Sequence, residues 1–339
     1  MTELLVGSSA LHNWHSVLAR KYPPSADIED AISHITRILS ISDSHLRLGD
    51  YICTLEKIAP KKAAALAWKV GTTAIVTESS PVDEAIRGCK TLGAALNWSC
   101  KFFPLLQDGS SLTLERNDQW AMLCYKIQDP TIWPRNVDAV YKLGLNARMI
   151  KAASPDAWAQ VQLGVEAESS VGNLNLAKIV QAPVIHGGNT NAIRFPAKYL
   201  DAQFAMPHTY EPEAINLLSA QLTKKERITP MSQRTRLLIF SRMTQGSVSQ
   251  THIAKALGLS SRTLRRRLST EGQSFQGLLD LCRMQSAALD LRTRDNISLS
   301  EMAIKLGYTE HSTFSRAFTR WAGVSPRAFR EEFREEYRK

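Results

Sequence analysis

The chain has 339 residues, which is too long for one ordinary domain core and favours two domains. Its composition, 44% hydrophobic and 22% charged, is that of a globular protein and excludes a fibrous or disordered chain. The net charge of +10 at pH 7 lies in the last third, because residues 224–339 hold 22 basic and 11 acidic side chains. This split predicts a polyanionic partner for the last third, with a merely solvated basic face as the alternative.

The sequence also limits the cellular compartment of the protein and the kinds of chemistry that we expect from it. It contains no run of about 18 apolar residues, so we expect no membrane span, and its N-terminus lacks the features of a secretory leader. Its five cysteines are scattered without metal-ligand or redox spacing, as reduced thiols are: Cys53, Cys89, Cys100, Cys124 and Cys282. We therefore expect a cytoplasmic protein with no cofactor, no metal site, no catalytic residue and no membrane partner.

Residues 1–70 are predicted to be mainly helical. Apolar side chains recur at three- and four-residue spacing in Leu11–Leu18 and in Ile28–Leu39, which is the pattern of helices with one buried face. Gly71 is expected to end an Ala-rich helix. The β-branched run Thr72–Val76 then predicts a strand.

A helix and a hairpin are predicted next. Pro81 favours the first position of a helix, with acidic residues in its first turn, and this helix is expected to reach about Leu96. Ser111–Arg116 and Gln119–Ile127 are predicted strands, joined by a two-residue turn at Asn117–Asp118.

The rest of the N-terminal part mixes helix and strand. We expect a helix over Asn136–Ile150 and strands over Lys178–Val184 and Asn191–Phe195. Because helices and strands are interspersed rather than in strict alternation, residues 1–207 are predicted to form one α+β domain.

A domain boundary is predicted after this part. Pro212–Thr223 has the spacing of one amphipathic helix, and the charged run 224–227 is typical of exposed chain. From Pro230 onward every segment has a helical pattern with Gly and Ser punctuation. We therefore predict a linker over 208–230 and an all-α domain over 231–339.

The all-α domain contains an internal repeat with an offset of 49 residues, Ser249–Leu259 and Ser298–Tyr308. In each copy a serine precedes a short helix, and an alanine lies four residues before a glycine. The alanine lets a second helix cross closely, and the glycine adopts the left-handed conformation that ends the first helix. Ser298 and Glu301 also form a capping box. Two such units in register predict two helix-turn-helix motifs.

Each motif is followed by a helix whose faces can be assigned at about 100° per residue. Leu264 and Leu268 are expected to anchor the first helix in the core, and Phe314, Phe318 and Trp321 the second. Basic and hydrogen-bonding side chains point away from these anchors or flank them, where a major groove would lie. For each arginine alone, the alternative is a solvated surface charge. The predicted DNA-contacting residues are Arg262, Arg265, Arg266, Arg267, His311, Ser312, Thr313, Arg316 and Arg320.

One helix is predicted to connect the two motifs. Phe275–Leu291 would be about 26 Å long, and two recognition helices one DNA turn apart need a separation of about 34 Å. After the second motif, Gly323 is expected to end the helix. Ser325 is the expected N-cap of the last helix and Pro326 its first residue.

The strings IAKALGLSSRTLRRRLSTEGQSFQGLLDLCR and EMAIKLGYTEHSTFSRAFTRWAGVSPRAFR lie within Ile253–Arg330. They closely resemble the signature of the AraC/XylS family of bacterial transcription regulators. The resemblance implies a seven-helix domain that reads two successive major-groove segments of double-stranded DNA. By position in the family motif, it implies base reading by Arg262, Arg265 and Arg266 in the first unit and by His311, Ser312, Thr313 and Arg316 in the second.

The first 207 residues are similar to the arabinose-binding type of N-terminal domain found in one branch of that family. The similarity rests on the order of elements and on VGTTAIVTESSPVDEAIRGCKTLG and APVIHGGNTNAIRFPAKYLD. It implies a domain that binds a small-molecule effector and forms a homodimer, without implying that the effector is a sugar. The whole chain would then act as an activator that recruits RNA polymerase.

Two alternatives to this hypothesis are open. A DNA-modifying or repair enzyme can carry an AraC-like DNA-binding tail, but such enzymes need a reactive, metal-associated cysteine cluster that five separated thiols do not supply. A regulator that senses no small molecule, and responds to a protein or acts constitutively, is the other alternative. The sequence favours an effector-responsive, sequence-specific DNA-binding transcription regulator.

Overall fold

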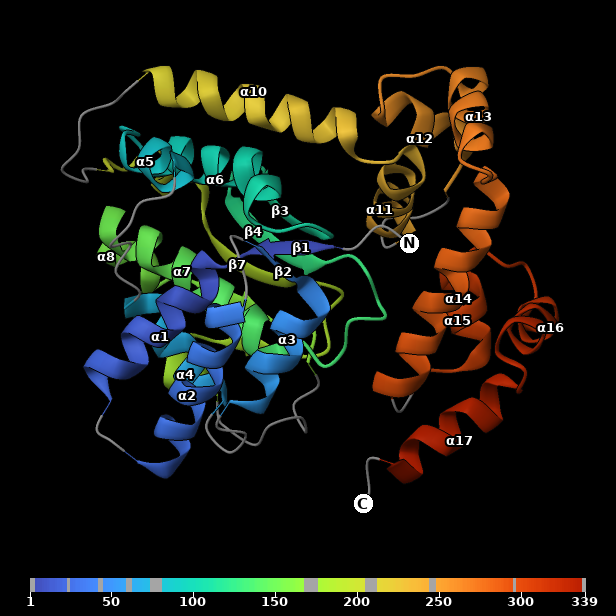
Figure 1. Cartoon of the computed structure of the whole chain (residues 1–339), viewed down its shortest axis with the longest axis horizontal. Coiled ribbons are helices and arrows are strands. Elements are labelled where there is room, and N and C mark those ends of the chain that lie inside the picture. Colours follow the sequence, from blue (N-terminus) through green and yellow to red (C-terminus); the bar gives the residue numbers. More distant parts are fainter. Residues whose placement is uncertain are drawn as a thin grey trace. The chain divides into compact units, whose positions relative to one another are not determined.

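The computed structural model describes residues 4–22, 25–41, 45–58, 63–73, 81–167, 176–204, 212–243, 248–294 and 297–336. Its chain, coloured from blue to red in Figure 1, forms two compact units. The N-terminal unit comprises Glu3–Ile127 and Pro134–Glu226. The C-terminal unit comprises Gln128–Trp133 and Arg227–Lys339.

The N-terminal unit contains a five-stranded sheet. Its strands, in sheet order, are β3 (Ser110–Arg116), β4 (Trp120–Ile127), β7 (Asn191–Pro196), β5 (Gln162–Gly164) and β6 (Val184–Ile185). Neighbouring strands are antiparallel except for β5 and β6, which are parallel. A separate antiparallel pair consists of β1 (Leu5–Gly7) and β2 (His45–Arg47).

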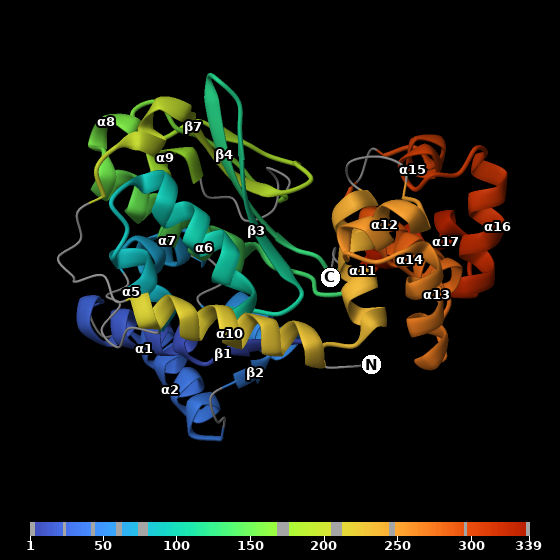
Figure 2. The same cartoon turned by 90° about the horizontal axis from the view of Figure 1, so that it is seen from above.

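Most other described residues of this unit are helical. The helices are α1 (Ser9–Lys21), α2 (Ala26–Ile41), α3 (Leu48–Lys57), α4 (Ala63–Thr73), α5 (Pro81–Arg87), α6 (Leu92–Leu106), α7 (Asn136–Ala153), α8 (Pro155–Trp158), α9 (Leu176–Val180), the 3-10 helix η1 (Ala197–Asp201) and α10 (Pro212–Ile228). Figure 2 shows α6 and α7 beside the β3–β4 ribbon. Both helices touch Tyr125 of β4, because its ring lies 5.8 Å from that of Phe103 and its hydroxyl donates to Asp138. The α+β class is as predicted.

The hairpin, the long helix and the last strand are confirmed. β3 and β4 pair along their full length. Asn117 closes the turn between them, because its side-chain oxygen accepts hydrogen bonds from the backbone N–H groups of Gln119 and Trp120. α7 begins at Asn136 as expected, and β7 covers the predicted Asn191–Phe195.

The predicted strand Thr72–Val76 is wrong in its first part. α4 continues to Thr73, so Thr72 is helical, while residues 74–76 lie outside the described residues. The sequence predicts that Gly71 ends the helix, but Gly71 lies inside it. The helix propensity of neighbouring residues cannot show that the helix continues through Gly71. The backbone that requires a glycine here lies on another helix.

That reason is the close packing of α4 on α7. A Cβ on Gly71 would overlap the backbone carbonyl oxygen of Tyr141, and one on Gly144 would lie 3.0 Å from the carbonyl oxygen of Trp68. The two glycines therefore let the two backbones approach each other directly. The cost of a glycine inside a helix is offset by the packing that it permits.

Two other predicted elements differ from the structure. The helix expected from Pro81 to about Leu96 is two helices, α5 and α6. Thr91 starts the second one, because its side chain accepts a hydrogen bond from the N–H of Ala94 at 3.2 Å. The expected strand Lys178–Val184 begins in the short helix α9 and continues as irregular chain, and only its last residue enters β6.

α10 occupies most of the expected linker. It continues to Ile228, so the charged residues 224–227 belong to the helix instead of irregular chain. Leu218 is buried, with Ile215 and Leu222 packed beside it, in a small core formed with α5 and α6. α10 up to Glu226 is thus part of the N-terminal unit.

The helices of the C-terminal unit are α11 (Met231–Met243), α12 (Gln250–Ala256), α13 (Ser261–Thr270), α14 (Phe275–Thr293), α15 (Leu299–Lys305), α16 (His311–Ala322) and α17 (Pro326–Glu336). Within the ranges that the structure describes, this unit has no strand, as predicted. In Figure 1, α14 extends from the α12–α13 pair to the α15–α16 pair. One hydrophobic core includes Ile253, Ala254, Leu264 and Leu268 of the first pair and Met302, Ala303, Phe314 and Phe318 of the second.

Candidate nucleic-acid interface

The two helix pairs contain matching turns. The residues that form them are Ala254, Gly258 and Leu259 in the first pair and Ala303, Gly307 and Tyr308 in the second. In each turn the N–H of the third residue donates to the carbonyl of the alanine, at 2.9 and 2.8 Å. Both glycines have positive φ, +69° and +81°. These are left-handed helix ends that satisfy the last carbonyl groups, as the sequence predicts.

The helix after each turn, α13 or α16, is fixed by large apolar anchors. Leu264 and Leu268 of α13 are fully buried, as are Phe314 and Phe318 of α16. The prediction for Trp321 is wrong, because 44% of this side chain is exposed. Its ring packs 5.7 Å from that of Phe318, at the end of α16 where the core has ended. We call α13 and α16 the recognition helices.

The predicted DNA-contacting side chains lie outside this core. Arg262, Arg265, Arg266, Arg267, His311, Ser312, Thr313, Arg316 and Arg320 are all exposed. Arg266 and Arg316 lie opposite the apolar anchors of their helices at about 100° per residue. Among the residues that the structure describes, none of the six arginines in this set has an ion-pair partner. Their charge is therefore available to phosphates and base edges.

α13 is fastened to α11 at its C-terminal end. Glu271 follows α13, and its carboxylate accepts hydrogen bonds from the N–H groups of Met231 and Ser232 at 2.6 and 2.8 Å. Burial raises the pKa of Glu271, but the hydrogen bonds from Ser232 and Met231 lower it more, so the pKa lies below its ordinary value. The ionised carboxylate then satisfies the N-terminus of α11 and fixes where the recognition helix ends.

Sequence reasoning missed one polar residue at this surface. Glu310 is the N-cap residue of α16 and is exposed, and its carboxylate accepts a hydrogen bond from the hydroxyl of Ser312 at 3.1 Å. The signal that could have found it is its place directly before His311, at the end of the helix that would enter the groove.

Comparison with known proteins agrees with this geometry. Residues 253–332 match the family model of a helix-turn-helix domain, and residues 61–204 match that of the N-terminal arabinose-binding domain of AraC transcription regulators. An uncharacterized HTH-type transcriptional regulator of Mycobacterium tuberculosis is 30% identical over 274 residues, 78% of this chain and 77% of that protein. The chain belongs to the AraC family of transcription regulators.

Two proteins of Pseudomonas aeruginosa are also similar to this chain. The HTH-type transcriptional regulator VqsM of Pseudomonas aeruginosa is 30% identical over 154 residues, 44% of this chain and 47% of that protein. The crystal structure of the transcriptional regulator CdpR of Pseudomonas aeruginosa aligns over 95% of this chain and 97% of that one, with 20% identity and a TM-score of 0.38. This AraC-family chain is a DNA-binding transcription regulator. Among its described helices, none is long and apolar enough to cross a membrane.

The N-terminal unit of this AraC-family regulator buries a charged cluster. Asp138 accepts hydrogen bonds from the hydroxyls of Tyr51 at 3.1 Å and Tyr125 at 2.5 Å. Burial, and next to it the Asp138 carboxylate, raise the pKa of both tyrosines well above the ordinary value, so both stay protonated and donate. Lys142 lies 3.9 Å from Asp138, and burial lowers the pKa of its ammonium group.

A half-buried carboxylate, Glu56 of α3, contacts the start of α7. Glu56 accepts a hydrogen bond from the N–H of Val137 at 2.8 Å, which satisfies a free donor of the helix N-terminus. Burial raises the pKa of Glu56 to about 7, more than this hydrogen bond lowers it. This group therefore titrates near neutral pH.

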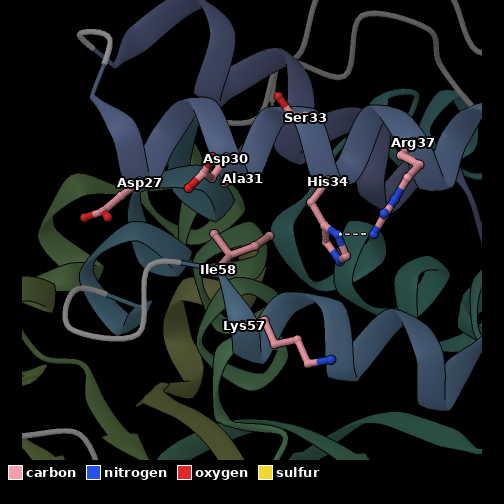
Figure 3. A pocket seen from close by; sticks show the side chains of 8 residues that line it. All are labelled: Asp27, Asp30, Ala31, Ser33, His34, Arg37, Lys57 and Ile58. Carbon is pink, nitrogen blue, oxygen red and sulfur yellow. Dashed lines mark hydrogen bonds between the residues drawn. The ribbon is translucent and has the colours of Figure 1, made fainter.

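The same unit has a surface groove of about 610 Å³ between α2 and the end of α3. Its lining residues are Asp27, Asp30, Ala31, Ser33, His34, Arg37, Lys57 and Ile58. Figure 3 shows the His34 ring bonded to the Arg37 guanidinium, at 3.1 Å, with Lys57 facing them from α3. The groove offers carboxylates at one end and cationic groups at the other, so its chemistry suits a polar ligand.

Proposed function

We propose that this regulator binds one DNA site with both recognition helices, placed in successive segments of the major groove. Neutralisation of phosphates by arginines supplies affinity, and hydrogen bonds to base edges supply specificity. The base-reading side chains are Arg262, Arg265 and Arg266 of α13 and His311, Ser312, Thr313 and Arg316 of α16. Arg267 and Arg320 flank these faces and contact the backbone.

The observation that carries this proposal is that both motifs share one core while their arginines stay outside it. The connecting helix α14 has 19 residues and is about 28 Å long, close to the 34 Å of one DNA turn. A continuous core fixes the spacing and orientation of the two recognition helices. Less free energy is then spent on ordering the protein when DNA binds.

The same proposal gives sensing to the N-terminal part. Residues 1–207 bind a small-molecule effector and form a homodimer, and 208–230, mostly α10, join them to the DNA-binding domain over 231–339. The match of 61–204 to the arabinose-binding domain model and the charged groove of Figure 3 support this assignment. Effector binding shifts the population of dimers that are competent for paired sites, and bound dimers recruit RNA polymerase as activators in the cytoplasm.

The base-reading assignment is tested by selection and titration. Full-length protein is selected against duplexes with a randomised centre, and the selected duplex is then compared with a scrambled one at fixed salt. Arg262→Ala combined with Arg266→Ala should reduce discrimination by about 1–3 kcal/mol for each bidentate contact. Arg327→Ala is the matched control, since this exposed arginine of α17 pairs with Glu331 in its own helix. Unchanged discrimination by the double variant contradicts the proposal.

The phosphate and dimer assignments have their own measurements. Each arginine that neutralises a phosphate contributes about −0.9 to the slope of log affinity against log salt, so its removal makes the slope shallower.

Full-length protein should also bind a duplex with two selected sites more tightly than one with a single site. A chain that sediments as a monomer and gains nothing from the second site would refute the dimer and leave the recognition helices unaffected.

A further inference from the structure

The two helix-turn-helix motifs differ by one residue in their turns. Their glycines are 49 residues apart, whereas the first buried anchors of the recognition helices, Leu264 and Phe314, are 50 apart. The turn of the second motif is therefore one residue longer. As a result, the N-cap position held by Ser260 in α13 is held by Glu310 in α16.

Glu310 does not cap its helix as five serines of this unit cap theirs. The serines that each accept a hydrogen bond from a backbone N–H of their own helix are Ser249, Ser260, Ser274, Ser298 and Ser325. The Glu310 side chain makes no such bond. Its carboxylate accepts from the hydroxyl of Ser312 instead, and both side chains are exposed. The Glu310 carboxylate thus makes no hydrogen bond to the backbone at the N-terminus of α16.

Glu310 and Ser312 present hydrogen-bond acceptors at the N-terminal end of α16. Ser312 has one hydroxyl proton and donates it to Glu310, so the free capacity of both side chains is for accepting. In the major groove, the donors that such groups can meet are the exocyclic amino groups, N4 of cytosine and N6 of adenine. Guanine and thymine present acceptor atoms, which would face the carboxylate unfavourably.

We propose that Glu310, oriented by Ser312, is a specificity-determining residue of the second motif that reads an exocyclic amino group in the major groove. This inference rests on the proposed docking of both recognition helices. It gives the residues at the start of the two recognition helices opposite hydrogen-bonding character. Arg262, Arg265 and Arg266 offer only donors, which suit guanine, whereas Glu310 and Ser312 offer acceptors, which suit cytosine or adenine.

The first experiment removes the carboxylate from the protein. Wild type, Glu310→Ala, Glu310→Ser and Glu331→Ala, all full length, are selected against the randomised duplexes, and base preferences are compared at each position. Glu331 is an exposed glutamate of α17 that bonds to Arg327, so its variant controls for the loss of one negative charge. Wild type and control should restrict one position under the second motif to cytosine or adenine. In both Glu310 variants, the preference for that base over the others should fall about ten-fold.

The second experiment removes the amino group from the DNA. In the selected duplex, the restricted base is replaced by its analogue without the exocyclic amino group, 2-pyrimidinone for cytosine or purine for adenine. Wild type should bind the analogue about ten-fold more weakly. Glu310→Ala should bind both duplexes equally, because it has no carboxylate to lose a partner. The analogue that produces the effect identifies which of the two bases is read.

Several outcomes would overturn this inference. Glu310→Ala could keep the base preferences of the wild type, or the analogue could weaken both proteins equally. Glu310→Ala could also melt at a lower temperature than the wild type, while Glu310→Ser restores both the melting temperature and the base preference. Glu310 would then act only as the N-cap of α16 and would not read a base. Failure of the proposed docking is distinguishable, because the wild type would then select no sequence and Arg316→Ala would bind DNA as the wild type does.

Discussion

The core of the N-terminal unit and the recognition helices of the C-terminal unit hold their charged residues in opposite ways. In the N-terminal unit, Asp138, Lys142 and Arg135 are buried at 0%, 7% and 3% exposure and help to hold helices and sheet together. In the C-terminal unit, the arginines of the recognition helices are exposed and the anchors beneath them are apolar. In the recognition helices, folding and binding are therefore carried by different residues. Elsewhere the C-terminal unit buries charged residues as the N-terminal unit does, namely Asp129, Arg236 and Asp290.

The largest expected effect tests this separation within α16. Phe314→Ala should lower the free energy of unfolding by about 3–5 kcal/mol, because it empties a fully buried site. Arg316→Ala, two residues along, should change stability by no more than about 0.5 kcal/mol while weakening DNA binding. Urea unfolding and DNA titration of the full-length variants measure both. A large stability loss in Arg316→Ala would mean that the two roles are not separate.

The next effect concerns backbone packing in the N-terminal unit. Gly71→Ala should destabilise by about 1–3 kcal/mol or more, because the new Cβ would overlap the backbone of α7, which cannot rotate away as a side chain could. Gly49→Ala in α3 is the control, since nothing lies within 4 Å of its added Cβ. That change should stabilise by about 0.5–1 kcal/mol. Equal melting temperatures for the two variants would contradict close packing of α4 on α7.

The half-buried carboxylate Glu56 predicts a pH effect confined to the N-terminal unit. Its pKa of about 7 in the folded chain exceeds its ordinary value of 4.5, so the folded state holds the proton more tightly. Stability from this group is present in full below the ordinary pKa and is lost as pH rises through about 7.

Glu56→Gln should remove this dependence and keep an oxygen acceptor for the N–H of Val137. The variant should be more stable than the wild type at pH 8, by at most about 3 kcal/mol, and by less than about 1 kcal/mol near pH 5. Urea unfolding at both pH values measures the difference. Glu115→Gln, at an exposed position of β3, is the control and should show no change. A wild type whose stability rises between pH 5 and 8 relative to Glu56→Gln would contradict the raised pKa.

The smallest effect concerns the turn of the first motif. Gly258 has a φ of +69°, and a Cβ added to it would meet nothing within 4 Å, so only its backbone conformation requires glycine. Gly258→Ala should cost about 1–2 kcal/mol, and Gly258→Asn should cost less, because asparagine tolerates the left-handed region. Thermal unfolding of the two variants measures the difference. Equal losses would show that space, and not φ, makes the glycine necessary.

The C-terminal unit was largely predictable because its information is local. Helix starts at serines, left-handed ends at glycines and apolar anchors at three- and four-residue spacing are read from neighbours along the chain. The same reasoning was wrong for Trp321, because periodicity continues along a helix after the core beneath it has ended. It missed Glu310, because an acidic N-cap residue is usually explained by the helix alone.

The N-terminal unit was less predictable because its elements depend on distant partners. The hairpin at Asn117 and the start of α7 follow from local turn and helix signals. The continuation of α4 through Gly71 depends on Tyr141, 70 residues away, and the packing of α10 depends on a core formed with α5 and α6. Such partners leave no periodic signal in the segment itself.

The sequence by itself determined that the last third is basic, helical and built from two related motifs, and which faces of their helices are polar. Only the tertiary structure decided that both motifs share one core and that Asp138 and Lys142 are buried side by side in α7. The physical reason is the range of the interactions. Capping, turn conformation and amphipathic spacing act over a few residues, whereas burial and hydrogen-bond partners are fixed when distant segments pack.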